Sequence, residues 1–175
     1  SVPVNKLTFG MVNEIKIIAG VKDASTHIEL SGSATYADKE VKGVNVNGVD
    51  ANFPAMYNIN LIAGRFITKG EVSGGKMVVI IGPSLKDKLF GTSSALGKEI
   101  KIKDKRFTVI GVTEAKGSSF GQDMDKSAYF PYTVAKQRFQ IDRPTYILVK
   151  TVDTTVLRKV QRDIEKALLK HLTKD

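Results

Sequence analysis

The sequence predicts an α+β protein in which the two chain ends form one subdomain and the middle of the chain forms a second, β-rich subdomain inserted into it. Two observations predict this arrangement. The two ends share helical and strand patterns, whereas glycines punctuate the middle at short intervals. We place the subdomain built from both ends at residues 1–52 and 143–175, and the insert at residues 53–142.

The composition suits a folded protein of ordinary size. The chain has 175 residues, of which 42% are hydrophobic and 26% are charged, enough to bury a core without covalent staples. It contains no cysteine, which excludes disulfides, thiolate metal sites and thiol nucleophiles. The net charge is +9, and residues 53–142 carry 14 basic against 8 acidic side chains. This excess raises nucleic acid, anionic lipid and acidic proteins as partners to consider.

The chain shows no pattern of a membrane helix. Its longest apolar runs, residues 77–81 and 146–149, fall far short of the roughly 20 residues that span a bilayer. Ser1 is not an initiator methionine, and no cleavable apolar leader follows it. We therefore expect the chain to be a processed or excised piece of a longer protein.

The first end of the chain predicts a helix. Apolar residues recur at spacings of four and three between Met11 and Ile18, within a helical stretch at residues 7–19. Thr8 is a candidate cap for the start of this helix. Gly20 suits the left-handed conformation that ends it.

A long hairpin follows the first helix. Residues 21–36 and 39–49 have the composition and alternation of two strands, and residues 37–38 provide a turn between them. The stretch from Asn45 to Asn52 is polar and rich in turn residues. Such stretches are typical of places where a chain leaves one unit for another, so we expect the first boundary near Asn52.

The insert predicts short elements. Residues 77–81 form a buried type of strand, and Pro83 opens a helix that Gly91 ends. We expect four segments in the remainder of the insert. They are a hairpin at residues 99–112, a polar loop at 113–127, an aromatic stretch at 129–132 and a helical turn at 134–139. The hairpin is expected to turn at residues 104–105, because isoleucines and charged residues alternate before that point.

The last end predicts a strand and an amphipathic helix. Pro144 marks the second boundary, and residues 146–150 form the strand. Asp153 caps a helix in which apolar residues from Leu157 to Leu168 recur at spacings of three and four.

The sequence shows no strong motif for catalysis or for binding a nucleotide or metal. Residues 91–98 superficially resemble a phosphate-binding loop, but the glycine spacing is wrong and Glu99 replaces the hydroxyl that would bind Mg²⁺. Residues 123–125 lack the glycine and the distal glutamate of a calcium loop. His27 and His171 have no neighbouring ligands at metal spacing, so we expect structural roles for them. No hydrolase elbow and no carboxylate pair is present, and we expect no catalytic residue, no cofactor and no metal.

A cluster of basic residues is the best candidate for nucleic-acid binding. It consists of Lys98, Lys101, Lys103, Lys105 and Arg106. Closely spaced cations can neutralise successive phosphates. However, Lys101 and Lys103 share the strand face opposite the hairpin's isoleucines, as a solvated edge would place them. No aromatic residues alternate with the basic cluster, and lysines protect exposed strand edges from pairing. We therefore favour a solvated edge and expect no nucleic-acid partner.

Six short motifs occur in the order and approximate spacing of a known family. They are Leu61-x-x-Gly64-Arg65-Phe66, Val78-Val79-Ile80-Ile81-Gly82, Leu89-Phe90-Gly91, Leu96-Gly97-Lys98, Phe107-Thr108-Val109-Ile110-Gly111-Val112 and Tyr129-Phe130-Pro131-Tyr132. Together they resemble the extracytoplasmic (periplasmic) core domain of the MacB/FtsX-type ABC transporter permeases, a group that includes the LolC/LolE lipoprotein-release system. Residues 7–21 and 42–46 extend the resemblance to nearly the whole chain. The family's first strand is represented at most by residues 1–5.

The resemblance implies a fold with a porter-like α/β subdomain formed by both chain ends and an inserted Sabre-like subdomain. The resemblance assigns structural roles to ten residues of these motifs. The ten residues are Gly64, Arg65, Phe66, Phe90, Gly91, Gly97, Phe107, Gly111, Val112 and Pro131. Gly64 and Gly111 would allow close backbone approach. The phenylalanines would be core residues, Arg65 would tie a loop through bonds to carbonyls, and Pro131 would fix an extended bend.

The resemblance also implies a non-catalytic domain on the extracytoplasmic face of a bacterial cytoplasmic membrane. Its partners would be the transmembrane helices of the same permease chain, a cytoplasmic ATPase domain or subunit, a dimer mate, and an extracytoplasmic protein. The helix at residues 153–172 would couple ATP-driven movement to this domain. The resemblance does not choose among three roles of such transporters. These roles are the release of lipoproteins, the efflux of peptides or drugs, and the regulation of cell-wall hydrolases. The alternative is a stand-alone secreted or surface binding module, which would equally lack catalytic motifs.

Overall fold

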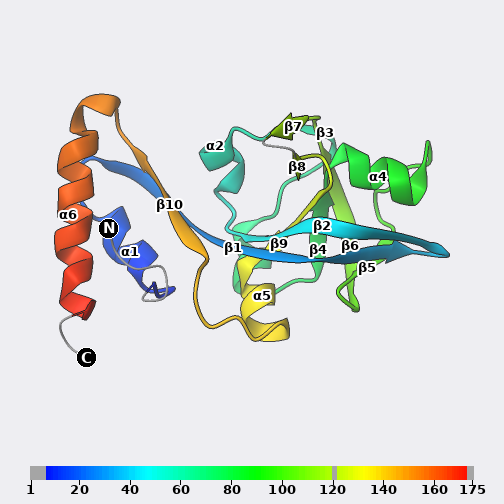
Figure 1. Cartoon of the computed structure of the whole chain (residues 1–175), viewed down its shortest axis with the longest axis horizontal. Coiled ribbons are helices and arrows are strands. Elements are labelled where there is room, and N and C mark those ends of the chain that lie inside the picture. The colour runs from blue at the N-terminus through cyan, green and yellow to red at the C-terminus, as the bar shows by residue number, and fades with distance from the viewer. Residues whose placement is uncertain (1–6, 120–121, 173–175) are drawn as a thin grey trace.

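The computed structural model describes residues 7–119 and 122–172. Within these residues, eight strands form one mixed sheet in the order β10-β1-β2-β9-β4-β6-β3, and β5 pairs with both β1 and β6 (Figure 1). The strands of this sheet are β1 (Val21–Tyr36), β2 (Lys39–Val49), β3 (Leu61–Gly64), β4 (Val78–Ile81), β5 (Glu99–Ile102), β6 (Lys105–Thr113), β9 (Ser127–Pro131) and β10 (Tyr146–Thr151). A small separate pair consists of β7 (Ser118–Ser119) and β8 (Gln122–Asp123).

Helices surround the sheet. They are α1 (Met11–Lys16), α2 (Phe53–Tyr57), α3 (Lys69–Ser73), α4 (Pro83–Phe90), α5 (Tyr132–Arg138) and α6 (Leu157–Leu172). Figure 1 shows α1 and α6 side by side at one end of the molecule, and α4 near the other end. The mixed architecture agrees with the α+β class expected from the sequence.

β1 runs along the whole molecule, and β2 pairs with its second half (Figure 1). Both strands have the predicted bounds, and Ala37 adopts a left-handed φ of 53° in the turn between them. The first half of β1 pairs with β10, and its second half pairs with β2. β2 in turn pairs with β9 in parallel, from Asn45 opposite Ser127 to Val49 opposite Pro131. The chain ends and the middle therefore share one hydrogen-bonded sheet.

The first helix is shorter than predicted. It covers Met11–Lys16 instead of residues 7–19, and its N-cap is Gly10, so the expected capping role of Thr8 is wrong. Beyond Lys16 the chain turns through two bonds, from Ile18 N–H to the Ile15 carbonyl and from Val21 N–H to the Ile18 carbonyl. β-branched isoleucines favour such an early end because they lose side-chain freedom in a helix.

The region after β2 differs most from the prediction. Asn45 and Asn47 lie within β2 instead of in a boundary loop, and the polar stretch ends in helix α2. α2, β3 and α3 were not predicted. Each has only four or five residues, too few to show a period of their own.

Two further expectations need correction. The β5–β6 hairpin forms, but its turn consists of Lys103 and Asp104, both with positive φ, rather than residues 104–105. This is the backbone twist that a two-residue hairpin turn requires. In α6, Val160 and Leu168 are buried as predicted, whereas Leu157 is 44% exposed. Asp153 caps the preceding 3₁₀ turn, Thr154–Val156, by accepting a bond from Thr155 N–H.

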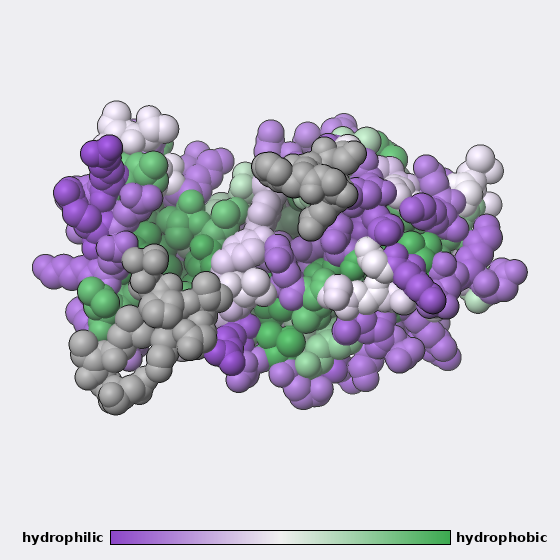
Figure 2. All heavy atoms as spheres, viewed as in Figure 1, coloured by the Kyte–Doolittle hydropathy of each residue, from purple (hydrophilic) through white to green (hydrophobic). Residues whose placement is uncertain are grey.

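Among residues 7–119 and 122–172, three apolar clusters stabilise the fold. The largest combines β1 and β2 side chains with those of the middle of the chain, including Phe107 and Phe130, whose rings stack at 4.8 Å. A second gathers around Phe53, and a third joins α1, β1 and α6. Figure 2 shows charged and polar residues over most of the visible face, with apolar residues gathered between α6 and β10. Side chains of Ile147, Val149 and Ile164 line the groove there.

Candidate functional site

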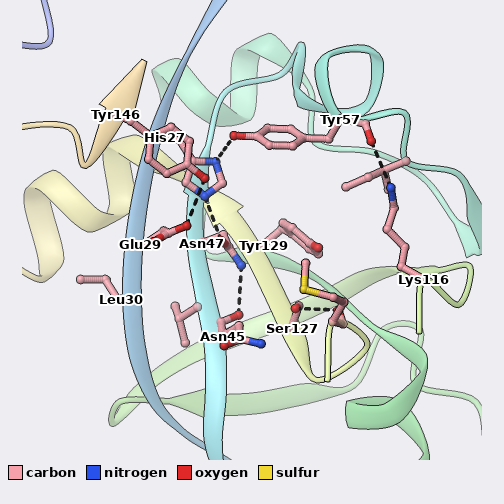
Figure 3. A pocket seen from close by; sticks show the side chains of 13 residues that line it. His27, Glu29, Leu30, Asn45, Asn47, Tyr57, Lys116, Ser127, Tyr129 and Tyr146 are labelled. Atoms are coloured by element: carbon pink, nitrogen blue, oxygen red, sulfur yellow. Dashed lines mark hydrogen bonds between the residues drawn. The ribbon is translucent and has the colours of Figure 1, made fainter. Parts of the chain in front are cut away.

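A surface pocket with a volume of about 260 Å³ lies where β1 and β2 meet β9, α2 and the start of β10 (Figure 3). Its walls carry His27, Asn47, Tyr57, Tyr129 and Tyr146. Alternation along β1 directs His27 and Glu29 to the same face of the sheet. The pocket therefore collects polar side chains from five elements that are distant in the sequence.

His27 forms the inner wall of the pocket and is 3% exposed. Its Nε2 lies 2.8 Å from Asn47 Oδ1, and its Nδ1 lies 2.7 Å from the Tyr57 hydroxyl. The Asn47 amide donates to the carbonyls of Asn45 and Ala128 at 3.0 and 3.2 Å. Asn47 Oδ1 must therefore accept from His27 Nε2–H, which leaves Nδ1 to accept from the Tyr57 hydroxyl.

This arrangement holds the imidazole in one neutral tautomer. Burial lowers the pKa of His27 below its ordinary 6.5, more strongly than the bond to Asn47 and the charge of Glu29 raise it. Both ring nitrogens are occupied within the wall. The imidazole thus acts as a fixed, uncharged surface of the pocket.

Aromatic rings make up much of the remaining wall. The Tyr146 ring stacks on His27 with 4.7 Å between centroids and 6° between planes, and the Tyr146 hydroxyl donates to Glu29 at 3.1 Å. Burial raises the pKa of the Tyr57 hydroxyl, and its contact with Tyr146 and the charge of Glu29 raise it further. Burial also raises the pKa of Tyr129. These hydroxyls stay protonated at neutral pH.

Lys116 lies at the outer side of the pocket. Its ammonium group donates to the carbonyls of Tyr57 and Asn58 at 3.0 and 3.3 Å, at the carboxyl end of α2 (Figure 3). A cation at this end opposes the partial negative charge of the free carbonyls. Among the described residues, no group of three metal-ligating side chains is present.

The motif residues lie elsewhere. Gly64 and Gly111 pair across β3 and β6, and a Cβ on Gly64 would lie 2.1 Å from the Ile110 carbonyl oxygen. Arg65 donates to the Phe66 carbonyl at 3.1 Å and to both carboxylate oxygens of Glu71 at 2.8 and 2.9 Å. Arg65 binds one carbonyl, whereas its main partner is the Glu71 carboxylate, which the motif did not predict.

The other motif residues lie in the apolar clusters, at turns and at the ends of elements. Phe90 and Phe107 lie in the largest cluster, whereas Phe66 is half-buried and packs edge-on against Phe53. Gly91 ends α4 and Pro131 ends β9. Gly97 has a positive φ of 79°, and Val112 is buried in β6. None of the ten motif residues lines the pocket.

The basic cluster stays on the surface. Lys101, Lys103 and Lys105 are exposed on the β5–β6 hairpin. Lys103 donates to the Ser31 carbonyl at 3.1 Å, and Arg106 lies 3.7 Å from Glu99. These contacts attach the hairpin to its neighbours and balance part of its charge.

The topology is shared with solved extracytoplasmic regions of transporters. The chain aligns with the extracellular domain of the noncanonic ABC-type transporter YknZ from Gram-positive bacteria with a TM-score of 0.83 and 24% identity, covering 92% of this chain and 81% of that one. It aligns with the periplasmic region of MacB from Actinobacillus actinomycetemcomitans with a TM-score of 0.80 and 23% identity, covering 93% and 74%. At these identities the likeness concerns the fold.

Curated proteins with similar sequences are also export permeases. The chain is 32% identical over 127 residues to the pyoverdine export ATP-binding/permease protein PvdT of Pseudomonas fluorescens (strain Pf0-1), covering 71% of this chain and 19% of that protein. It is 30% identical over 154 residues to the macrolide export ATP-binding/permease protein MacB of Bdellovibrio bacteriovorus (strain ATCC 15356 / DSM 50701 / NCIMB 9529 / HD100), covering 87% and 24%. The chain thus spans about a fifth to a quarter of the length of these relatives.

These comparisons define the class of protein as an extracytoplasmic domain of ABC transporter permeases. The chain belongs to the family of MacB-like periplasmic core domains, whose pattern matches residues 3–167. The resemblance inferred from the six motifs is confirmed, as is the location outside the cytoplasmic membrane. None of the helices in residues 7–119 and 122–172 combines the length and the apolar character that spanning a bilayer requires.

Proposed function

We propose that the chain is the non-catalytic extracytoplasmic domain of an ATP-driven export permease and that it transmits movement driven by a separate ATPase. Its family, and the export permeases among its relatives, support this function over a stand-alone binding module. The proposed partners are the membrane helices and the ATPase of the same transporter, a dimer mate and an extracytoplasmic protein. The relatives export different compounds, so the proposal leaves the substrate open.

One structural observation carries the proposal: α6 is attached to the strand that runs through the whole molecule. Leu168 packs in a cluster with Met11, Ile15 and Ala24, which joins α6 to α1 and β1. Near its other end, α6 passes so close to Gly20 that a Cβ there would lie 2.8 Å from Val160 Cγ2. His171 Nε2 adds a hydrogen bond to the Glu14 carboxylate at 2.8 Å. Movement of α6 is therefore passed to β1.

The long hairpin would carry that movement onward. β1 and β2 form a hydrogen-bonded ribbon that reaches β5 at one end and β9 along its side. Close-packed interiors transmit displacement because they deform little. We propose that residues 1–52 and 143–175 act as the porter-like lever and that residues 53–142 form the Sabre-like part that it displaces.

A flexible linker inserted after Leu172 in the complete permease tests this coupling. The chain contains no cysteine, so Asp38→Cys, at the exposed turn between β1 and β2, gives one labelling position on this domain. We expect ATP hydrolysis to continue while the ATP-dependent change in a fluorescent or spin label at position 38 disappears. The matched control carries the same Gly-Ser linker between Ser93 and Ser94, in an exposed loop, and should keep both signals. An unchanged label signal with the linker after Leu172 would contradict the mechanism.

A further inference from the structure

The pocket beside His27 has the chemistry of a site for a positively charged organic group. His27 and Asn47 already satisfy each other and their neighbours. They therefore offer a ligand a rigid wall and no free charge. What remains accessible is the aromatic surface of Tyr57, Tyr129 and Tyr146 and the carboxylate of Glu29.

Two carboxylates, those of Glu29 and Asp125, act on the tyrosine rings of the pocket. Burial is the main cause that raises the pKa of Tyr57, Tyr129 and Tyr146. The charge of Glu29 raises the pKa of Tyr57 and Tyr146 further, and the charge of Asp125 adds to that of Tyr129. The carboxylates therefore act on all three phenol rings. The faces of such rings attract cations through their quadrupole, and the attraction grows when the cation is partly desolvated.

Glu29 is free to serve as the anionic partner. It is exposed at the rim, and its carboxylate accepts a bond from the neutral Tyr146 hydroxyl. The ammonium group of Lys116 is held on the carbonyls of Tyr57 and Asn58. Two backbone carbonyls thus hold the Lys116 ammonium group at the end of α2.

We propose that this pocket binds a compact organic cation, a primary or quaternary ammonium group, between the tyrosine rings and the Glu29 carboxylate. The site is independent of the transport role proposed above. Its ligand chemistry is set by aromatic faces and one carboxylate, and it needs no metal. A pocket of about 260 Å³ accommodates a small headgroup and part of an attached chain.

Choline and its uncharged isostere 3,3-dimethylbutan-1-ol test the site by NMR titration of the 175-residue chain. We expect choline to shift the signals of the His27 and Tyr57 rings saturably below about 50 mM, a range suited to a weak single-headgroup ligand. The alcohol, which matches choline in shape, should not do so. Equal responses to both compounds, or no saturable response to choline, would overturn the proposal.

Three variants sharpen the test. Glu29→Gln should weaken choline binding about tenfold by removing the anionic partner. Glu40→Gln, which changes an exposed carboxylate outside the pocket, should leave binding unchanged. Lys116→Met should strengthen it because a competing positive charge is removed. If acetate binds in place of choline and Lys116→Met abolishes that binding, the pocket is an anion site and the proposal is wrong. Because these measurements use no ATP and no membrane, their failure would leave the transport proposal standing.

Discussion

Gly64 and Ile110 approach each other so closely that no side chain fits between them. A Cβ on Gly64 would lie 2.1 Å from the Ile110 carbonyl oxygen, and Gly64 has a positive φ of 78°. A hydrogen bond holds the two segments at this distance, because Arg65 N–H donates to the Ile110 carbonyl at 3.0 Å. The contact explains in physical terms why glycine occupies the first of the six motifs.

Gly64→Ala is therefore expected to destabilise the fold strongly. A clash with a backbone atom cannot be relieved by a side-chain rotation, so we expect a loss of about 3 kcal/mol, at the upper end of single-substitution effects. Gly97→Ala is the matched control, because Gly97 has a similar φ of 79° with no atom within 4 Å of its added Cβ. It should cost about 1 kcal/mol from backbone strain alone. Urea unfolding followed by circular dichroism measures both, and equal losses would refute the contact argument.

The start of α3 offers a second prediction. Thr68 Oγ1 accepts from Glu71 N–H at 3.1 Å, and the Glu71 carboxylate accepts from Thr68 N–H at 2.9 Å. Thr68→Ala removes one half of this capping box and should lower the free energy of unfolding by about 1 kcal/mol. Glu71→Gln keeps an acceptor for Thr68 N–H but loses the ion pair with Arg65, so we expect a loss of about 0.5 kcal/mol at neutral pH.

The effect of Glu71→Gln should depend on pH. The bonds from Arg65 lower the pKa of Glu71 from 4.5 to about 2. A carboxylate with a lowered pKa stabilises the folded state above its unfolded pKa and loses that contribution as the pH falls through its folded pKa. The stability difference between the wild type and Glu71→Gln should therefore shrink between pH 4.5 and 2. A difference that stays constant over this range would show that the ion pair contributes nothing.

His27 provides a third prediction. Its pKa lies below 6.5 in the folded protein because of burial, so the unfolded chain binds a proton at a pH where the folded chain does not. Stability should fall as the pH drops below 6.5, by about 1.4 kcal/mol for each unit of the pKa difference. NMR titration of the imidazole signals, assigned with His171→Ala, measures the pKa directly.

Tyr57→Phe tests whether the bond from Tyr57 adds to the effect of burial on the pKa of His27. The Tyr57 hydroxyl donates to Nδ1 and so favours the neutral imidazole. Without it, we expect the pKa of His27 to rise towards 6.5. Tyr36→Phe changes a tyrosine outside the pocket and should leave the pKa unchanged. A wild-type His27 that already titrates at 6.5 or above would contradict the neutral assignment.

Local patterns predicted the elements whose side chains repeat with a clear period. β1 and β2 were predicted with their observed bounds, and α4 with its proline start and glycine end. The short elements α2 and α3 were missed because five residues show too little of a helical period. The hairpin turn was misplaced by one residue because charged residues occupy both candidate positions.

The pocket was beyond the reach of pattern reasoning. His27 was expected to be structural, and its place in the wall depends on Asn47, Tyr57 and Tyr146, which lie 20, 30 and 119 residues away in the sequence. No spacing rule connects such residues, because β1, β2, α2 and β10 meet through the sheet. The alternation along β1 places His27 and Glu29 on the same face of the sheet, and this was the one hint of the pocket in the sequence. It does not identify the residues that they contact.

The sequence by itself determined the family, through short motifs whose glycines and aromatic residues meet local backbone and packing needs. It also determined the long hairpin and the amphipathic C-terminal helix, because hydrophobic periodicity is a local property. The tertiary structure alone decided that one sheet joins the chain ends to the middle and that three tyrosines, a neutral histidine and a carboxylate share a pocket. Those features arise from strand pairing across long separations, and such pairing leaves no periodic trace along the chain.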